Sequence, residues 1–236
     1  EEDVTFVTST QSWASGNIAR ANELKDKFAG MTLEEIQNFA WWDEFTCWEL
    51  GSDMAAFLAA IQMGEITSDL PELTPEKARE LKMQGFREVY TDPYAESIPF
   101  SFDGTEDFSG MAIELKDFRM LSGVTGAQIA QLEQMLRCSG LENVKWSGNE
   151  DISGVRMEDM TIGNSIPPSV AATGTYSMCT LQVAFTGEED FSKASFEGCD
   201  LTKSTGLTGH QFVHGSFLGD ETLKCSLPSI AFTGQE

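Results

Sequence analysis

The chain has 236 residues, with 15 Lys or Arg against 38 Asp or Glu, so its formal net charge is −23. So acidic a chain does not favour direct binding to nucleic acid or to an anionic membrane, because both need clustered cationic side chains. Hydrophobic residues make up 41% of the chain, which is enough for a folded core and excludes wholesale disorder. No apolar run is long enough to predict a transmembrane segment.

Residues 1–95 are predicted to form a mainly helical region with degenerate repeats. The chain opens on Glu1 rather than on Met, as expected where a secretory signal has been removed, so we expect a secreted, periplasmic or cell-surface protein. Apolar spacing predicts helices over residues 18–28, 32–45, 53–63 and 75–84. We interpret this region as a helical cap on a repeat domain that covers residues 96–236.

A recurring threonine motif marks the expected start of several helices. The motif places Glu, Gln or Lys three residues after the threonine, at Thr32, Thr74, Thr125 and Thr208. Threonine and Glu or Gln at this spacing form a capping box, in which each side chain accepts the other residue's backbone N–H. The apolar spacing after Thr125 predicts a short amphipathic helix that reaches position 136, whereas the two prolines at 167–168 predict a loop.

A ten-residue pattern recurs in the second half of the chain. Its complete copies, each containing a Glu-Asp pair, occupy residues 100–109, 144–153 and 183–192, and a partial copy begins at 230. Their aromatic anchors are spaced by 44, 39 and 47 positions, at Phe102, Trp146, Phe185 and Phe232. A unit of about forty residues cannot bury an apolar face alone, so neighbouring units are expected to stack into a solenoid.

Apolar residues in this region also recur at every fifth position. The clearest run contains Phe191, Phe196 and Leu201, with Ala194 and Cys199 in the small-residue positions. This pattern resembles the pentapeptide-repeat family, whose Leu or Phe and small residues point into a right-handed, four-sided β-helix. The threonine-capped helices are similar to those of a bacterial subgroup that places a short helix before its pentapeptides. The resemblance implies a β-solenoid with a short helix inserted in each repeat.

A leucine-rich-repeat-like α/β solenoid is the alternative fold. Leu141, Val144, Trp146, Asn149 and Ile152 roughly fit the strand-and-turn pattern of that class. Leucine-rich repeats usually contain about 20–29 residues, which is shorter than the unit seen here. The pentapeptide-like solenoid is therefore the preferred prediction.

The cysteines and histidines predict no catalytic or metal site. The five cysteines cannot all pair, form no CxxC motif and are expected to be buried thiols, at Cys47, Cys138, Cys179, Cys199 and Cys225. His210 and His214 have the spacing found in zinc enzymes, but Gln211 replaces the glutamate of that motif and no third ligand is evident. We therefore predict neither a metal nor another cofactor.

Two groups of residues are predicted to form an interaction surface. Stacked units would bring the Glu-Asp pairs into an acidic row. We interpret these carboxylates as residues that stabilise turns rather than as calcium ligands. They are Glu106, Asp107, Glu150, Asp151, Glu189 and Asp190. The densest aromatic cluster is expected in the core, or else exposed as a binding platform, at Trp41, Trp42 and Trp48.

The sequence contains no nucleophile elbow, phosphate-binding loop or dinucleotide-binding fingerprint. We therefore predict a non-enzymatic solenoid that presents an extended acidic surface to an unknown protein partner. One alternative is a DNA-mimicking protein that acts on a DNA-binding enzyme, as the resemblance to pentapeptide proteins implies. Another is a surface carbohydrate-binding module that uses the tryptophans.

Overall fold

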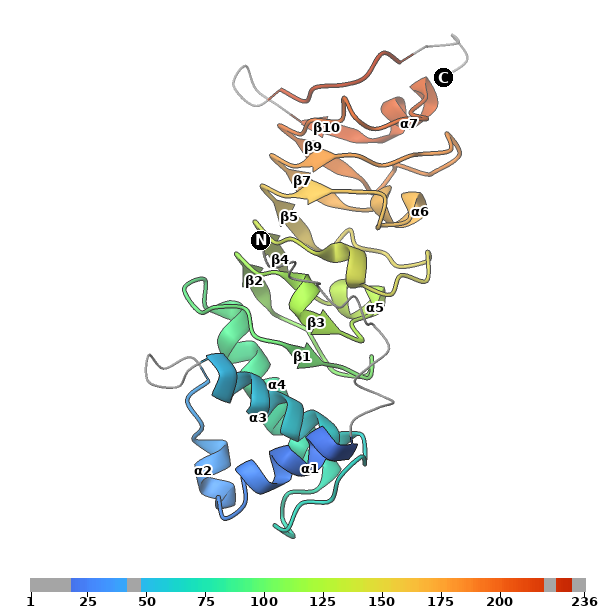
Figure 1. Cartoon of the computed structure of the whole chain (residues 1–236). Coiled ribbons are helices and arrows are strands. Elements are labelled where there is room, and N and C mark those ends of the chain that lie inside the picture. The colour runs from blue at the N-terminus through green and yellow to red at the C-terminus, as the bar shows by residue number, and fades with distance from the viewer. Residues whose placement is uncertain (1–17, 42–47, 219–223, 231–236) are drawn as a thin grey trace, which may run out of the picture.

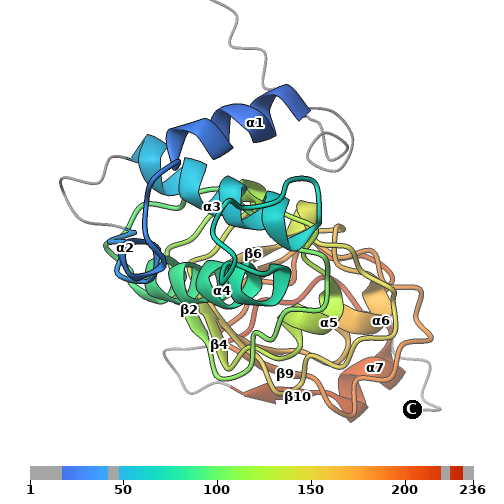
Figure 2. The ribbon, with the colours of Figure 1, turned by 90° about the horizontal axis from the view of Figure 1, so that it is seen from below.

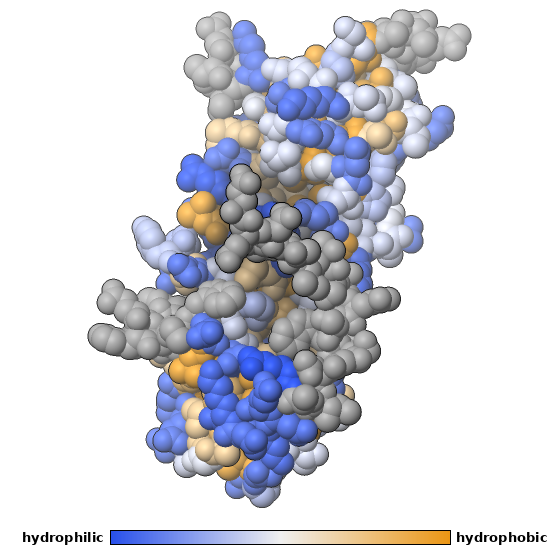
Figure 3. Space-filling model, viewed as in Figure 1, coloured by the Kyte–Doolittle hydropathy of each residue, from blue (hydrophilic) through white to orange (hydrophobic). Residues whose placement is uncertain are grey.

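A computed structural model describes residues 18–41, 48–218 and 224–230 of the chain (Figure 1). In these ranges the longer helices lie at one end of an elongated molecule, and short parallel strands stack away from them. None of the helices there combines the length and the apolar character needed to cross a membrane. In Figure 3 the strongly hydrophilic residues gather over the helical end, while the visible surface above the strands is paler and interrupted by apolar residues.

Four helices precede the first strand: α1 (Ile18–Lys27), α2 (Leu33–Gln37), α3 (Trp48–Gln62) and α4 (Pro75–Thr91). The capping prediction is confirmed, because Thr32 forms a capping box with Glu35 and the Thr74 side chain accepts the Lys77 N–H. Helix α2 is much shorter than predicted. Helix α4 is longer, because Phe86 and later apolar residues keep its buried face continuous beyond position 84.

The principal sheet has six parallel strands in the order β10-β9-β7-β5-β4-β2. These strands are β2 (Ala112–Glu114), β4 (Gln134–Leu136), β5 (Arg156–Glu158), β7 (Thr175–Ser177), β9 (Ser195–Glu197) and β10 (Ser216–Leu218). The middle residues of neighbouring strands are paired and point inward, so they form one apolar row: Ile113, Met135, Met157, Tyr176, Phe196 and Phe217. The rings of Tyr176 and Phe196 stack with their centroids 5.4 Å apart.

Two smaller parallel pairs and several short helices complete the described fold. Strand β1 (Phe100–Ser101) pairs with β3 (Leu121–Ser122), and β6 (Thr161–Ile162) pairs with β8 (Thr180–Leu181). The short helices are η1 (Phe118–Met120), α5 (Gly126–Ile129), η2 (Leu141–Asn143), α6 (Pro168–Ala171) and α7 (Gly209–His214). Helices α5, α6 and α7 lie together on one side of the molecule in both views (Figures 1 and 2).

These short helices confirm some local predictions and correct others. Capping boxes are present at Thr125 and Thr208. Helix α5 nevertheless has four residues, and Leu136 belongs to strand β4 rather than to that helix. The loop predicted at the two prolines is wrong, because Pro168 begins α6. Proline is well tolerated there, because the backbone N–H of the first helical residue has no hydrogen-bond partner within the helix.

The predicted β-solenoid is wrong, both as a pentapeptide-like β-helix and in its leucine-rich-repeat-like form. The structure has a mixed α/β fold with a six-stranded parallel sheet and several helices. The five-residue pattern was misleading. Phe191, Phe196 and Leu201 are indeed buried, but only Phe196 lies in a strand, the three-residue β9, whereas Phe191 and Leu201 each precede a turn. A four-sided β-helix needs a short extended segment on each side of every coil. In this structure, helices and irregular turns occupy several of those connections.

Strand spacing explains the long sequence repeat. Strands of the principal sheet begin 22, 22, 19, 20 and 21 residues apart, so one sequence unit of about forty residues contributes two strands. The Glu-Asp turns precede β2, β5 and β9, whereas short helices α5, α6 and α7 precede β4, β7 and β10. The alternation places equivalent residues on every second strand.

The helical region and the sheet share one hydrophobic core. Trp41 packs against Phe100 with ring centroids 5.7 Å apart, and Phe86 of α4 lies 4.9 Å from Phe108. Gly85 of α4 is required by this contact, because a Cβ atom there would lie 2.1 Å from the Trp41 ring. The sheet is therefore fixed to the helices by aromatic packing.

Candidate interaction surface

The three Glu-Asp turns have the same local structure. Each begins with a left-handed glycine, Gly104, Gly148 or Gly187, at φ between 89° and 92°. The glutamate then folds back onto its own loop. Glu150 accepts the N–H groups of Ser147 and Gly148 at 2.7 and 2.9 Å, and the first and third turns repeat this arrangement. The glutamates therefore stabilise the turns.

The aspartates of these turns lie at the surface. Asp107, Asp151 and Asp190 are exposed, and each accepts the N–H of the serine two residues later, at 2.8–3.1 Å. Hydrogen bonds from those serines lower the pKa of Asp107 and Asp190. A hydrogen bond from Lys193, followed by those from Ser153, lowers the pKa of Asp151 to about 2. The predicted acidic row is thus formed chiefly by aspartates.

Glu106 does not belong to any surface, so its assignment to the interaction surface is wrong. Its side chain and that of Lys82 are both fully buried, and they form an ion pair with 2.8 Å between Oε1 and Nζ. Lys82 Nζ also donates to the Ser101 carbonyl at 2.6 Å, and Gln62 Nε2 donates to Glu106 at 3.0 Å. Burial opposes ionisation of Glu106, but the bonds from Gln62 and Lys82 and the Lys82 charge leave its pKa below the ordinary value. This pair joins α4 to the first turn.

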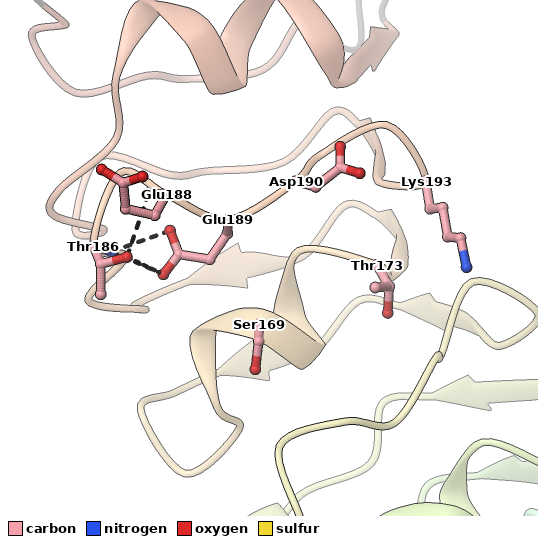
Figure 4. A pocket seen from close by; sticks show the side chains of 7 residues that line it. All are labelled: Ser169, Thr173, Thr186, Glu188, Glu189, Asp190 and Lys193. Atoms are coloured by element: carbon pink, nitrogen blue, oxygen red, sulfur yellow. Dashed lines mark hydrogen bonds between the residues drawn. The ribbon is translucent and has the colours of Figure 1, made fainter.

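A cavity of about 540 Å³ lies beside the third turn (Figure 4). It is lined by Ser169, Thr173, Thr186, Glu188, Glu189, Asp190 and Lys193. Its hydroxyl groups serve the local structure: Thr186 Oγ1 donates to Glu189 at 2.8 Å, and Ser169 Oγ donates to the Gly148 carbonyl at 2.7 Å. Lys193 forms an ion pair with Asp151. The cavity is therefore an acidic recess whose hydroxyl groups are engaged in holding the surrounding loops.

The outer face of the principal sheet is a second candidate. Its outward side chains form two columns, the first with Ala112, Gln134, Arg156, Thr175, Ser195 and Ser216, the second with Glu114, Leu136, Glu158, Ser177, Glu197 and Leu218. All except Ser177 are exposed or half-buried. We call these columns, together with the residue that follows each of β2, β4, β5 and β7, the open sheet face. Parallel sheets are usually covered on both faces, so this exposure is unusual.

The residues that follow those four strands have a left-handed backbone. They are Leu115, Arg137, Asp159 and Met178, at φ between 50° and 55°, and Gly198 has the same conformation after β9. A left-handed conformation costs a residue other than glycine about 1–2 kcal/mol. The Met178 N–H donates to the Glu197 carbonyl at 2.8 Å, so the sheet imposes the conformation. Leu115 and Met178 nevertheless leave 49% and 48% of their surface exposed.

The cations of the open sheet face are already neutralised. Arg137 Nε lies 2.8 Å from Asp159 Oδ2, and Arg156 Nη2 lies 3.2 Å from Glu158 Oε1. Within the described residues no ion pair involves Glu114 or Glu197. The face therefore offers negative charge that no ion pair in this part of the chain neutralises, together with the exposed apolar side chains of Leu115, Met178 and Leu218.

The predicted tryptophan cluster is described in part. Trp41 is buried and packs against Phe39 and Phe100, with ring centroids 5.2 and 5.7 Å away, as the core interpretation expects. Trp42 lies outside the described residues. Trp48 begins α3, but its side chain also lies outside what the structure describes.

The cysteines follow the expectation of buried free thiols where they are described, except that Cys225 is half-buried. Cys138, Cys179 and Cys199 are free and buried, and Cys225 is free and half-buried, while Cys47 lies outside the described residues. Burial raises the pKa of Cys138 and Cys179 to about 11 and that of Cys199 to about 12. The rings of His210 and His214 have centroids 4.5 Å apart on the exposed side of α7. Across the described ranges, no group of three candidate metal ligands comes together.

Three important residues were missed from the sequence: Lys82, Leu115 and Met178. A signal was present for part of the open sheet face, because a glutamate follows each turn aspartate by seven positions, at Glu114, Glu158 and Glu197. Comparison with protein-family models, with curated proteins and with solved structures gave no match to this chain. The function is therefore inferred from the geometry of the chain itself.

Proposed function

We propose that this chain is a non-enzymatic binding protein and that its open sheet face binds a protein partner. The observation that carries the proposal is the half-exposure of Leu115 and Met178 at left-handed positions on that face. Asparagine or glycine would adopt this backbone at lower cost. Large apolar side chains at such positions do not favour solubility, and a partner that buries them would offset both costs.

The dimensions of the face suit a polypeptide ligand. Six strands at about 4.8 Å spacing extend about 24 Å from β2 to β10. An extended segment of about seven residues has the same length. The side chains along this strip are mostly short or of moderate length, so a backbone can approach the sheet closely.

The other two hypotheses receive less support from the described geometry. DNA mimicry was tied to a regular four-sided β-helix, and the fold is a mixed α/β one. Carbohydrate binding required exposed tryptophans, and Trp41 is buried. The acidic recess beside the third turn is not favoured as an active site, since its hydroxyl groups hold neighbouring loops in place.

A random dodecapeptide display library would test the proposal. Peptides selected on the wild-type protein are expected to bind the double variant Leu115→Asn/Met178→Asn at least tenfold more weakly. The matched control is Tyr94→Asn/Val213→Asn, which removes two other exposed apolar side chains that lie away from the sheet. Circular dichroism and melting curves check that all variants are folded. Selected peptides that bind both double variants as well as the wild type would refute the proposed surface.

A further inference from the structure

We infer that the open sheet face binds a basic, extended segment of the partner protein, with Lys or Arg at every third position. This inference rests on the function proposed above and specifies the chemistry of the ligand. It is carried by the spacing and the ion-pairing state of the charged residues on the face.

The glutamates of the face have a regular spacing. Glu114, Glu158 and Glu197 occupy the same column on β2, β5 and β9, which are every second strand of the sheet. Two strand spacings amount to about 9.6 Å. Leu136 and Ser177 fill the column positions between the glutamates. The face thus presents a carboxylate about every 9.6 Å, separated by an uncharged residue.

An extended polypeptide can match this spacing. In the polyproline II conformation three residues complete one turn and advance about 9.3 Å, so residues i, i+3 and i+6 lie on the same side. A β-strand is less suitable, because residues three apart point to opposite sides. Cationic side chains at every third position of a polyproline II segment would therefore meet successive glutamates.

Charge complementarity selects a basic ligand over the other occupants. Four carboxylates on the face stand against two guanidinium groups, and both guanidinium groups already pair with Glu158 and Asp159. Glu114 and Glu197 have no ion pair within 4 Å among the described residues, although the charge of Arg137 also acts on Glu114. Glu197 is therefore expected to contribute most to binding, followed by Glu114. A second copy of this chain would bring the same acidic face and would be repelled. The net charge of −23 also favours the approach of a cationic segment.

Two synthetic peptides of identical composition test the spacing. Both contain three lysines, three prolines and three leucines; the first places lysine at positions 1, 4 and 7, and the second places the lysines together. Titration calorimetry at 0.15 M salt is expected to show at least fivefold tighter binding of the periodic peptide. Its affinity is expected to fall at least fivefold with Glu114→Gln/Glu197→Gln, and to stay unchanged with the control Glu72→Gln/Glu188→Gln, which removes two exposed charges elsewhere.

The outcomes separate this inference from the proposed function. Equal binding of the two peptides, or binding that is insensitive to Glu114→Gln/Glu197→Gln, would overturn the inference. If the library peptides that depend on Leu115 and Met178 proved neutral or acidic, the inference would fail while the proposed function stood. If no library peptide depended on those two residues, both would fail.

Discussion

Replacement of Glu106 by glutamine tests whether a buried ion pair holds the helices on the sheet. The substitution keeps the size of the side chain but removes the negative charge that faces Lys82 Nζ at 2.8 Å. Lys82 is fully buried, so its ammonium group would lose its ionic partner without gaining water. Breaking one side of a buried pair costs about 3–5 kcal/mol, and we expect the free energy of unfolding to fall by that amount.

Glu150→Gln is the matched control. Glu150 makes the same bonds to its turn, to Ser147 and Gly148, but it is half-buried and forms no ion pair with any described residue. Loss of charge there weakens two hydrogen bonds, with an expected cost of about 1 kcal/mol. The difference between the two variants isolates the contribution of the pair with Lys82. The free energies of unfolding of both variants are measured by urea titration at pH 7, monitored by circular dichroism. The comparison requires that the dependence of the free energy on urea concentration is similar in both variants.

A double variant distinguishes the ion pair from a general loss of packing. Lys82→Met/Glu106→Gln removes both charges and keeps the volume of the site similar, so it is expected to be more stable than Glu106→Gln alone. Equal costs for Glu106→Gln and Glu150→Gln would refute the reasoning. So would a double variant less stable than the single one.

Three further predictions concern stability and reactivity. Leu115→Asn and Met178→Asn should each raise the free energy of unfolding by about 0.5–1 kcal/mol, because asparagine tolerates the left-handed backbone better; a loss of stability in urea titrations would contradict this. The pKa values of Glu106 and Asp151 are lower in the folded state, so their stabilisation is complete above their unfolded pKa values and is lost as the pH falls through the folded ones. The melting temperature should therefore fall between about pH 5 and pH 2, and a constant value over that range would be inconsistent with these shifts. The three buried thiols should react slowly with a thiol reagent at pH 8 and rapidly in urea, so fast labelling of the native protein, located by mass spectrometry, would show that they are accessible.

Local chemistry explains which parts of the fold were predictable. The threonine caps at positions 32, 125 and 208 were found because a capping box needs two residues three positions apart. The Glu-Asp turns were also visible, since glycine and the carboxylates that accept N–H groups are adjacent in sequence. Helix α6 was missed because proline suits both a loop and the first position of a helix, so two prolines do not distinguish them.

Long-range contacts explain what the sequence could not provide. Glu106 and Lys82 are 24 residues apart, and nothing in the local pattern around either residue distinguishes Glu106 from Glu150. The conformation of Leu115 and Met178 depends on hydrogen bonds to the next strand of the sheet. A leucine or methionine in sequence carries no sign of a left-handed backbone, so these residues became candidates only with the strand register.

The ratio of the sequence period to the strand period determines how charge is distributed over this molecule. If every strand were equivalent, a glutamate column would place like charges about 4.8 Å apart and would destabilise the sheet. Because the repeat spans two strands, Glu114, Glu158 and Glu197 alternate with uncharged residues at twice that spacing. The same alternation separates the three turn aspartates seven residues earlier. The chain can therefore carry a high negative charge along the open sheet face and in the turns before its strands, and on that face the spacing is one that an extended cationic ligand can match.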